Sequence, residues 1–160
     1  EKFIPPKKGR KHILHIIKEI IDFHPEHTGT DINQALQYLT NVQKKRCTMF
    51  LISDFIAPAD YMDSMLIANR KHDLVAIQVY DKRDAELPDV GLVRMCDSET
   101  GHLQWVDTSS SSVRKEYARA WYEHSQQLAH TTARCGVDLA TVSTDEDFVK
   151  QLLVLFKKRG

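Results

Sequence analysis

Two apolar runs of strand length, one helix apart, constrain the fold of this chain more than any other feature. The runs cover residues 47–53 and 73–80, and an aspartate follows each of them at once. Runs of this kind are typical of strands buried on both faces in the centre of a parallel sheet. Apolar residues at helical spacing lie between them at 61–66. A strand, a helix and a strand in this order predict a parallel pair joined by a right-handed crossover.

The rest of the chain alternates helical and extended patterns. Apolar spacing predicts further helices at about 10–23, 30–42, 113–134 and 148–156, the second of them with Thr30 as its N-cap. Extended pieces at 92–96 and 103–106 flank turn residues at 97–101 and predict a β-hairpin. Residues 137–142 predict a third parallel strand, and 143–146 has the spacing of a capping box.

These elements predict an α/β protein with three parallel strands, one hairpin and about five helices. Three strands are few, because an open doubly wound sheet usually has about five or six. The run 47–53 is also too apolar for an exposed sheet edge. We therefore expect strands upstream of Glu1. A small sheet completed by the hairpin is the alternative.

Composition limits the classes of function. The 160 residues suit one domain, and 22 basic against 22 acidic residues leave no net charge, so nucleic-acid binding is not predicted. No apolar run reaches the roughly 18 residues of a membrane helix. The three cysteines, Cys47, Cys96 and Cys135, are widely spaced and odd in number. They predict reduced thiols and a cytoplasmic protein.

Two oxygen-bearing side chains are expected at the carboxyl edge of the sheet, where open parallel sheets bind ligands. Thr30 opens a helix after Gly29, and Asp54 follows the first apolar run. A hydroxyl and a carboxylate suit Mg²⁺, which takes about six oxygens in all. Thr30 and Asp54 are therefore the candidate metal ligands, but a third loop with further ligands is not apparent. The simpler interpretation of Thr30 is a plain N-cap, and that of Asp54 is a loop residue.

Two histidine pairs form a competing metal hypothesis. His12 and His15 share one helical face, as do His24 and His27, and such pairs could bind Zn²⁺. His12 and His24 are more than three turns apart on the same helix, so the pairs do not easily converge. Locally bonded or solvent-facing histidines are the favoured interpretation.

Several stretches resemble a known family. Gly29-Thr30-Asp31 before a helix and Leu-Ile-Ser-Asp54 after a strand look like the second and third loops of a von Willebrand factor A-type domain. Phe3-Ile-Pro-Pro-Lys-Lys-Gly-Arg-Lys-His12, Lys71-His-Asp-Leu-Val, Tyr80-Asp-x-x-Asp-x-Glu-Leu-Pro-x-x-Gly91 and Asp97-x-Glu-Thr-Gly101 resemble the bacterial family labelled domain of unknown function fifty-eight. The similarity runs over essentially the whole chain, and the order and spacing of the motifs make it specific.

The resemblance implies a three-layer, Rossmann-like domain of about six strands with a metal-ion-dependent adhesion site. Thr30 and Asp54 match its second and third loops, whereas the Asp-x-Ser-x-Ser loop after its first strand is absent from this sequence. Residues 1–160 are thus expected to be one partial domain, its C-terminal portion. The intact domain would bind Mg²⁺ or a similar cation, and this portion alone would hold none.

The function expected on this basis is a non-enzymatic module for protein interaction or assembly. The resemblance suggests a MoxR-type AAA ATPase as partner. The unpaired edge of strand 47–53 would favour a homodimer. The alternative is a phosphatase-like or phosphate-binding enzyme that uses Asp54 as nucleophile and the basic cluster Lys7–Lys11 for phosphate. Such enzymes usually carry a second carboxylate two residues on, where this chain has Ile56.

Overall fold

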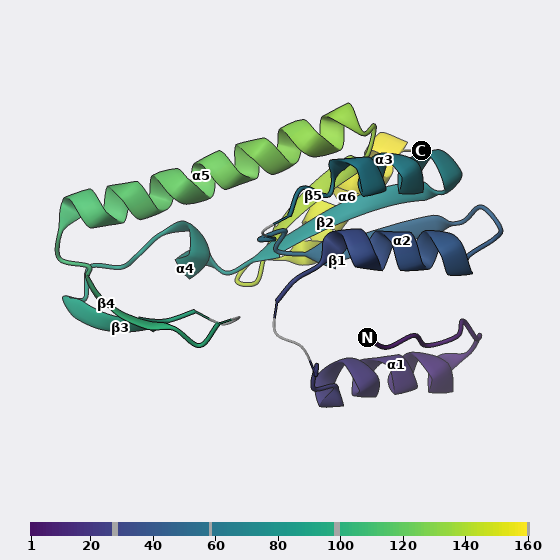
Figure 1. Cartoon of the computed structure of the whole chain (residues 1–160), viewed down its shortest axis with the longest axis horizontal. Helices are drawn as coiled ribbons and strands as arrows, with labels where there is room; N and C mark the ends of the chain where they lie inside the picture. The colour runs from purple at the N-terminus through teal and green to yellow at the C-terminus, as the bar shows by residue number, and fades with distance from the viewer. Residues whose placement is uncertain (27–28, 58, 98–99, 160) are drawn as a thin grey trace.

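Three parallel strands form the central sheet of the computed structural model, which describes residues 1–26, 29–57, 59–97 and 100–159. β1 (Thr48–Ser53) pairs with β2 (Asp73–Tyr80), and β2 pairs with β5 (Asp138–Ser143). The order β1-β2-β5 places β2 in the middle (Figure 1). The parallel pairing predicted for the two apolar runs is therefore confirmed.

Six helices accompany the strands within the described residues. They are α1 (Arg10–Asp22), α2 (Ile32–Val42), α3 (Met62–Lys71), α4 (Lys82–Ala85), α5 (Ser111–Arg134) and α6 (Phe148–Arg159). Each helix expected from the sequence is present. The short α4 was not expected, because four residues are too few to show a helical period.

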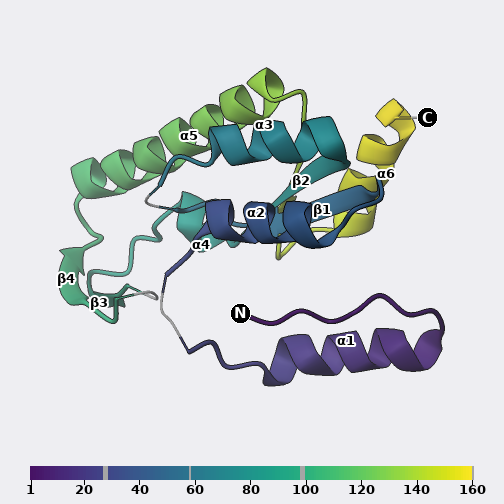
Figure 2. The same cartoon turned by 45° about the vertical axis from the view of Figure 1, so that its right-hand side comes forward.

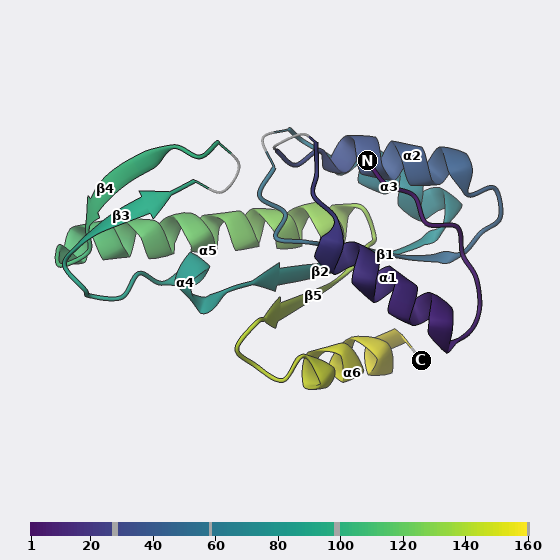
Figure 3. The same cartoon turned by 90° about the horizontal axis from the view of Figure 1, so that it is seen from below.

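Helices lie on both faces of the sheet, which gives the three-layer α/β arrangement that the resemblance implied. Figure 3 shows α2, α3 and α5 on one side of the sheet and α6 on the other. Alternate residues of β2 pack into two hydrophobic cores, one on each face of the sheet, because successive side chains of a strand point to opposite faces. Leu74 and Ala76 pack with residues of α2 and α3, whereas Val75 and Ile77 pack with Leu155 of α6.

The hairpin is a separate sheet. β3 (Leu92–Cys96) and β4 (Leu103–Asp107) pair antiparallel, as expected, and lie beyond the end of the main sheet near the start of α5 (Figure 1). Within the described residues they share no pairing with β1, β2 or β5, so the alternative of a main sheet completed by the hairpin is wrong. Of the turn predicted at 97–101, Ser98 and Glu99 lie outside the described residues.

β1 is an edge strand with one exposed face. Met49 is buried, but Phe50 and Ile52 are 45% and 63% exposed on the other face. The prediction that run 47–53 is buried on both faces is therefore wrong. Its outer edge pairs with no strand within residues 1–26, 29–57, 59–97 and 100–159, as expected. α6 packs over β5, and at β1 its Phe156 ring lies 6.2 Å from the Phe50 ring.

α1 stands apart from both cores. None of its residues is buried, although it carries apolar residues at helical spacing. Figure 2 shows the N-terminal segment running back alongside α1. Lys2 pairs with Glu19 of α1, and the Phe3 ring lies 6.0 Å from the Tyr38 ring of α2. These contacts join α1 to the rest of the described chain at its periphery.

Two predicted helix starts are wrong in detail. Asp31, and not Thr30, is the N-cap of α2, since its Oδ1 accepts a hydrogen bond from the Gln34 amide at 2.9 Å. The capping box expected at 143–146 does not form, because Ser143 is still the last residue of β5. Before α6, the side chain of Asp147 accepts from the Val149 amide instead. Neighbouring hydroxyl and carboxylate side chains compete for the same cap, and tertiary packing selects one of them.

Candidate functional site

Asp54 begins a tight turn at the carboxyl end of β1. Its Oδ1 accepts hydrogen bonds from the Ile56 amide at 3.1 Å and from the Ser53 hydroxyl at 3.3 Å. The Ser53 oxygen in turn accepts from the Phe55 amide at 3.0 Å. The Asp54 side chain is exposed, so the turn fixes one carboxylate oxygen and presents the group to solvent.

Phe55 holds this turn in a strained backbone conformation. Its φ is 63°, in the left-handed region that costs a residue with a side chain of order 1 kcal/mol or more. The side chain is only 1% exposed, and its ring lies 6.0 Å from that of Tyr61. Burial of the ring offsets the backbone cost and anchors the turn that carries Asp54 to the core.

Two side chains from elements distant in sequence lie within hydrogen-bond distance of the backbone carbonyl oxygen of Asp54. Gln78 of β2 is 1% exposed, donates to the carbonyl oxygen at 3.5 Å, and accepts from the Thr141 hydroxyl at 3.3 Å. His124 of α5 places Nε2 3.3 Å from the same oxygen. The end of β1 is thereby connected to β2, β5 and α5.

Sequence reasoning missed both of these residues. Gln78 was detectable, because it is the single polar residue within the apolar run 74–79. His124 was detectable only as a polar member of an otherwise apolar helix face. Its ring lies 5.8 Å from that of Trp121, and Trp121 lies 5.1 Å from Tyr80 at the end of β2. These aromatic contacts hold α5 over the carboxyl edge of the sheet.

Thr30 lies at the start of α2, on the same edge. Asn33 of α2 donates to the carbonyl of Asp60 at 2.8 Å, and this contact joins the start of α2 to the segment that follows Asp54. Because Asp31 caps α2, the simpler interpretation of Thr30 as the N-cap no longer applies. Thr30 itself is partly exposed.

Asp81, the aspartate after β2, is committed to structure. It caps α4 through a hydrogen bond from the Arg83 amide at 2.8 Å, and it accepts from the Thr144 hydroxyl at 3.1 Å. The Arg83 amide and then the Thr144 hydroxyl hold the pKa of this carboxyl below its usual value. Asp81 therefore ties β2 to the loop after β5.

Thr30 and Asp54 would offer a Mg²⁺ ion two oxygens, one hydroxyl and one carboxylate. A hydroxyl and a carboxylate have the right chemistry, but Mg²⁺ needs about six oxygens. In the described part of the chain, no three His, Cys, Asp or Glu side chains are grouped as metal ligands. This also leaves the zinc hypothesis without a cluster. His12 and His15 lie with ring centroids 6.1 Å apart on α1, and His27 lies outside the described residues.

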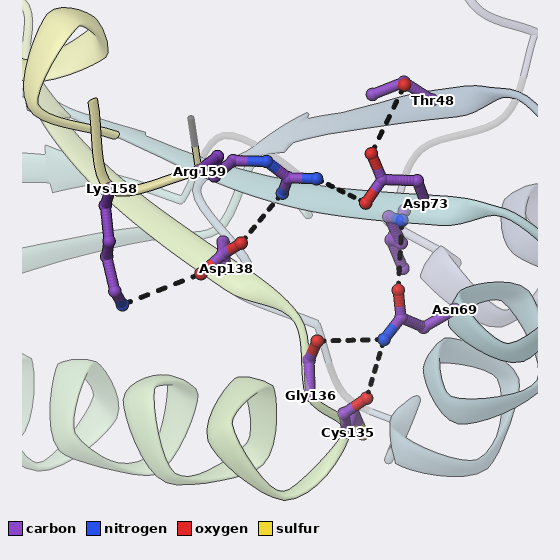
Figure 4. Close-up of polar contacts among 9 residues, drawn as sticks. Thr48, Asn69, Asp73, Cys135, Gly136, Asp138, Lys158 and Arg159 are labelled. Atoms are coloured by element: carbon purple, nitrogen blue, oxygen red, sulfur yellow. Dashed lines mark hydrogen bonds and ion pairs between the residues drawn. The ribbon is translucent and has the colours of Figure 1, made fainter. Parts of the chain in front are cut away.

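The amino edge of the sheet, in contrast, is closed by internal ion pairs. Arg159 at the end of α6 lies between Asp73 and Asp138, the first residues of β2 and β5 (Figure 4). Lys158 lies 3.6 Å from Asp138, and the Thr48 hydroxyl donates to Asp73 at 3.3 Å. Asn69 joins α3 to the carbonyls of Cys135 and Gly136. These contacts are consistent with a structural role for this edge.

The basic cluster Lys7–Lys11 is not brought to Asp54. It precedes and opens α1, and Figures 1 and 3 show the start of α1 at the end of the molecule away from the carboxyl ends of β1 and β2. Two surface hollows, one along α6 and one between α4 and α5, also lie away from Asp54.

None of the helices within the described ranges is long and apolar enough to cross a bilayer.

Comparison with curated proteins finds relatives without an assigned function. An uncharacterised protein of Mycobacterium bovis is 30% identical over 98% of this chain, and the match spans 50% of that protein. An uncharacterised protein of Mycobacterium avium is 29% identical over 98% of the chain and 93% of its own length. An uncharacterised protein in the moxR 3′ region of Paracoccus denitrificans is 33% identical over 43% of the chain. The chain thus spans about half the length of the first of these relatives.

A solved structure and a family model also match. The crystal structure of conserved hypothetical protein BatB from Bacteroides thetaiotaomicron covers 91% of this chain and 67% of its own, with 13% identity and a TM-score of 0.49. The model of the family described as protein of unknown function DUF58 matches residues 1–127. On this match, which agrees with the resemblance seen in the sequence, the chain belongs to the DUF58 family.

Proposed function

We propose that this chain is part of a non-enzymatic protein-interaction module of the von Willebrand factor A type, whose contact site is the carboxyl edge of the sheet around Asp54. One observation carries the proposal. Gln78 and His124 converge on the carbonyl of Asp54 while its carboxylate remains exposed. A rigid turn that presents an exposed carboxylate suits a docking site better than a reaction pocket, because enzyme sites are usually concave.

A divalent cation completes this contact in the proposal. Thr30 and Asp54 supply two oxygens, and water together with groups outside these 160 residues supplies the others. A carboxylate of the partner is one such group. The chain alone then holds no tightly bound Mg²⁺, because two protein oxygens leave most of the coordination shell to water.

A MoxR-type AAA ATPase in the cytoplasm is the partner we propose. The relative from Paracoccus, which is named for its place in the moxR 3′ region, supports this choice. The cytoplasmic setting is supported by the three cysteines, none of which forms a disulfide within the described residues. The partner binds to the edge that presents Asp54.

Self-association through β1 is a second part of the proposal. The outer edge of β1 pairs with no strand among the described residues, and Phe50 and Ile52 are exposed beside it. An unpaired apolar edge favours pairing with another strand, and two copies could join their β1 edges about a twofold axis.

Sedimentation of the whole chain with a MoxR-type AAA ATPase tests the partner. We expect a complex in Mg²⁺ that is lost on chelation and in Asp54→Ala. Asp107→Ala is the matched control, since Asp107 is also an exposed aspartate that accepts from the amide two residues on. A complex that survives Asp54→Ala, or that forms equally well with chelator, would overturn the proposal.

A further inference from the structure

Cys47 and His72 form a thiol–imidazole pair at the amino edge of the sheet. The Cys47 sulfur lies 3.6 Å from Nδ1 of His72. The backbone holds the two residues side by side, since the carbonyl of Cys47 accepts from the Asp73 amide at 2.9 Å. Cys47 precedes β1 and His72 caps α3, so both are placed by regular elements.

His72 is a buried imidazole with one nitrogen directed at the sulfur. The residue is 0% exposed, and within the described residues its Nε2 has no hydrogen-bond partner. Burial lowers the pKa of His72, and the charges of Lys71 and Arg46 lower it further. The ring is therefore neutral near pH 7. In the tautomer protonated on Nδ1, the ring donates its Nδ1–H to the Cys47 sulfur. This tautomer leaves Nε2 without a hydrogen, so no unpaired N–H group is buried.

Two cationic residues are chain neighbours of this pair. Arg46 precedes Cys47, Lys71 precedes His72, and both charges lower the pKa of His72. A partly exposed thiol in contact with an imidazole has the geometry of a reactive cysteine. Cys47 is partly exposed, so small reagents can reach it.

The other two cysteines lack this combination. Cys135 is buried, its thiol donates to the Met62 carbonyl at 3.5 Å, and burial raises its pKa. Cys96 is exposed on the hairpin, and its thiol donates to the carbonyl of Asp97 at 3.6 Å. Within the part of the chain that the structure describes, no hydrogen bond places an imidazole or a cation on either sulfur, so both serve as internal references.

We propose that Cys47 is a modification site that hydroperoxides oxidise to a sulfenic acid, with His72 as the residue that positions and stabilises the thiolate. The thiol first loses its proton to water. The thiolate attacks the distal oxygen of the hydroperoxide, an S–O bond forms and the O–O bond breaks. The departing alkoxide takes a proton from water. Sulfur is oxidised, an organic hydroperoxide is reduced to an alcohol and hydrogen peroxide to water, and no other reactant is needed.

This site is independent of the proposed docking edge. Cys47 precedes β1 and Asp54 follows it, so the strand separates the two. Oxidation of Cys47 places a larger polar group beside His72, between the ends of α3 and β1, and is expected to loosen this corner. The inference therefore stands or fails without reference to the partner or the cation.

Sulfenic acid trapping tests the inference on the whole chain. The protein is treated with limiting hydrogen peroxide and the trap dimedone, and peptide mass spectrometry quantifies the label on each cysteine. We expect most of the label on Cys47. We expect His72→Leu to lower its labelling rate about tenfold relative to Cys96, the factor that corresponds to one lost hydrogen bond of about 1.4 kcal/mol. His72→Asn, which keeps a donor at this position, should retain most of the rate.

The contrary results are equally clear. Cys96 labelled as fast as Cys47 in the unaltered chain would overturn the proposal, and so would equal labelling of Cys47 in His72→Leu and the parent. If both His72 variants fail to fold, the ranking of the three cysteines in the unaltered chain decides. Asp54→Ala should leave the labelling pattern unchanged, which separates this result from the docking proposal.

Discussion

His124 of α5 lies with Nε2 3.3 Å from the backbone carbonyl of Asp54, across 70 residues of sequence. Gln78 reaches the same oxygen from β2. The carbonyl of the residue proposed for docking is therefore held by two side chains from the neighbouring strand and the covering helix. A contact site that depends on the direction of one carboxylate gains from a fixed backbone, because less freedom is lost on binding.

Replacement of Gln78 by Leu should destabilise the fold. The change removes the donor to Asp54 and the acceptor of the exposed Thr141 hydroxyl, at a cost of about 0.5–1.5 kcal/mol in the free energy of unfolding. Urea unfolding followed by circular dichroism measures it. Gln104→Leu, at an exposed position of β4, should change the free energy by less than about 0.5 kcal/mol. Equal effects of the two changes would contradict the assigned role of Gln78.

At position 55, the usual order of stability of alanine and glycine variants should be reversed. Truncation to alanine removes a buried ring and costs about 3–5 kcal/mol. Glycine removes the same ring but also relieves the left-handed backbone, so Phe55→Gly should be at least as stable as Phe55→Ala. At Phe50, within β1, glycine should be the less stable of the pair. Thermal unfolding of the four variants decides, and the same order at both sites would refute the strain at Phe55.

Arg159→Met should weaken the attachment of α6. Arg159 pairs with Asp73 and Asp138 from two strands and is largely shielded from solvent (Figure 4). Its loss leaves two neighbouring carboxylates without their shared cation, and we expect a fall of about 1–3 kcal/mol in the free energy of unfolding. Arg119→Met is the control, since Arg119 forms an exposed pair with Glu123 within one helix. A fall in the melting temperature that is no larger for Arg159→Met than for Arg119→Met would count against this role of Arg159.

Stability should fall with pH below about 6.5 because of His72. Burial lowers its pKa from the ordinary value of 6.5, so the unfolded chain binds a proton that the folded chain does not. The contribution of neutral His72 to the free energy of unfolding is complete above the pKa of the unfolded chain, and it decreases as pH falls through that pKa. His72→Asn should flatten this slope between about pH 7.5 and 5. His102→Asn, at an exposed position, is the control for loss of an imidazole. Urea midpoints across this range measure both slopes, and an unaltered slope in His72→Asn would refute the assignment.

The edge of β1 should determine the oligomeric state. Light scattering of the chain at high concentration should give the mass of a dimer, and Ile52→Lys should shift it to a monomer, because a lysine beside an unpaired edge opposes strand addition. Ile67→Lys serves as the control, since Ile67 is similarly exposed but lies on α3. A monomer in the unaltered chain, with a cooperative melt, would contradict pairing through β1.

The local pattern of the sequence was sufficient for the class of fold. The apolar runs at 47–53 and 73–80 became neighbouring parallel strands, and the turn chemistry near 97–101 became a hairpin. These predictions succeeded because helical and strand periods are encoded over a few residues and survive in most tertiary settings. The same local pattern placed Asp54 directly after β1.

Tertiary structure decided which groups meet. The sequence contains Gln78 and His124, but only the register of β2 with β1 and the packing of α5 bring both to the Asp54 carbonyl. It also decided that Asp31 rather than Thr30 caps α2, and that β1 has one exposed face. Long-range contacts depend on the relative placement of whole elements, which is set by the sum of many small packing energies, whereas the period of a strand or helix is set by its own residues.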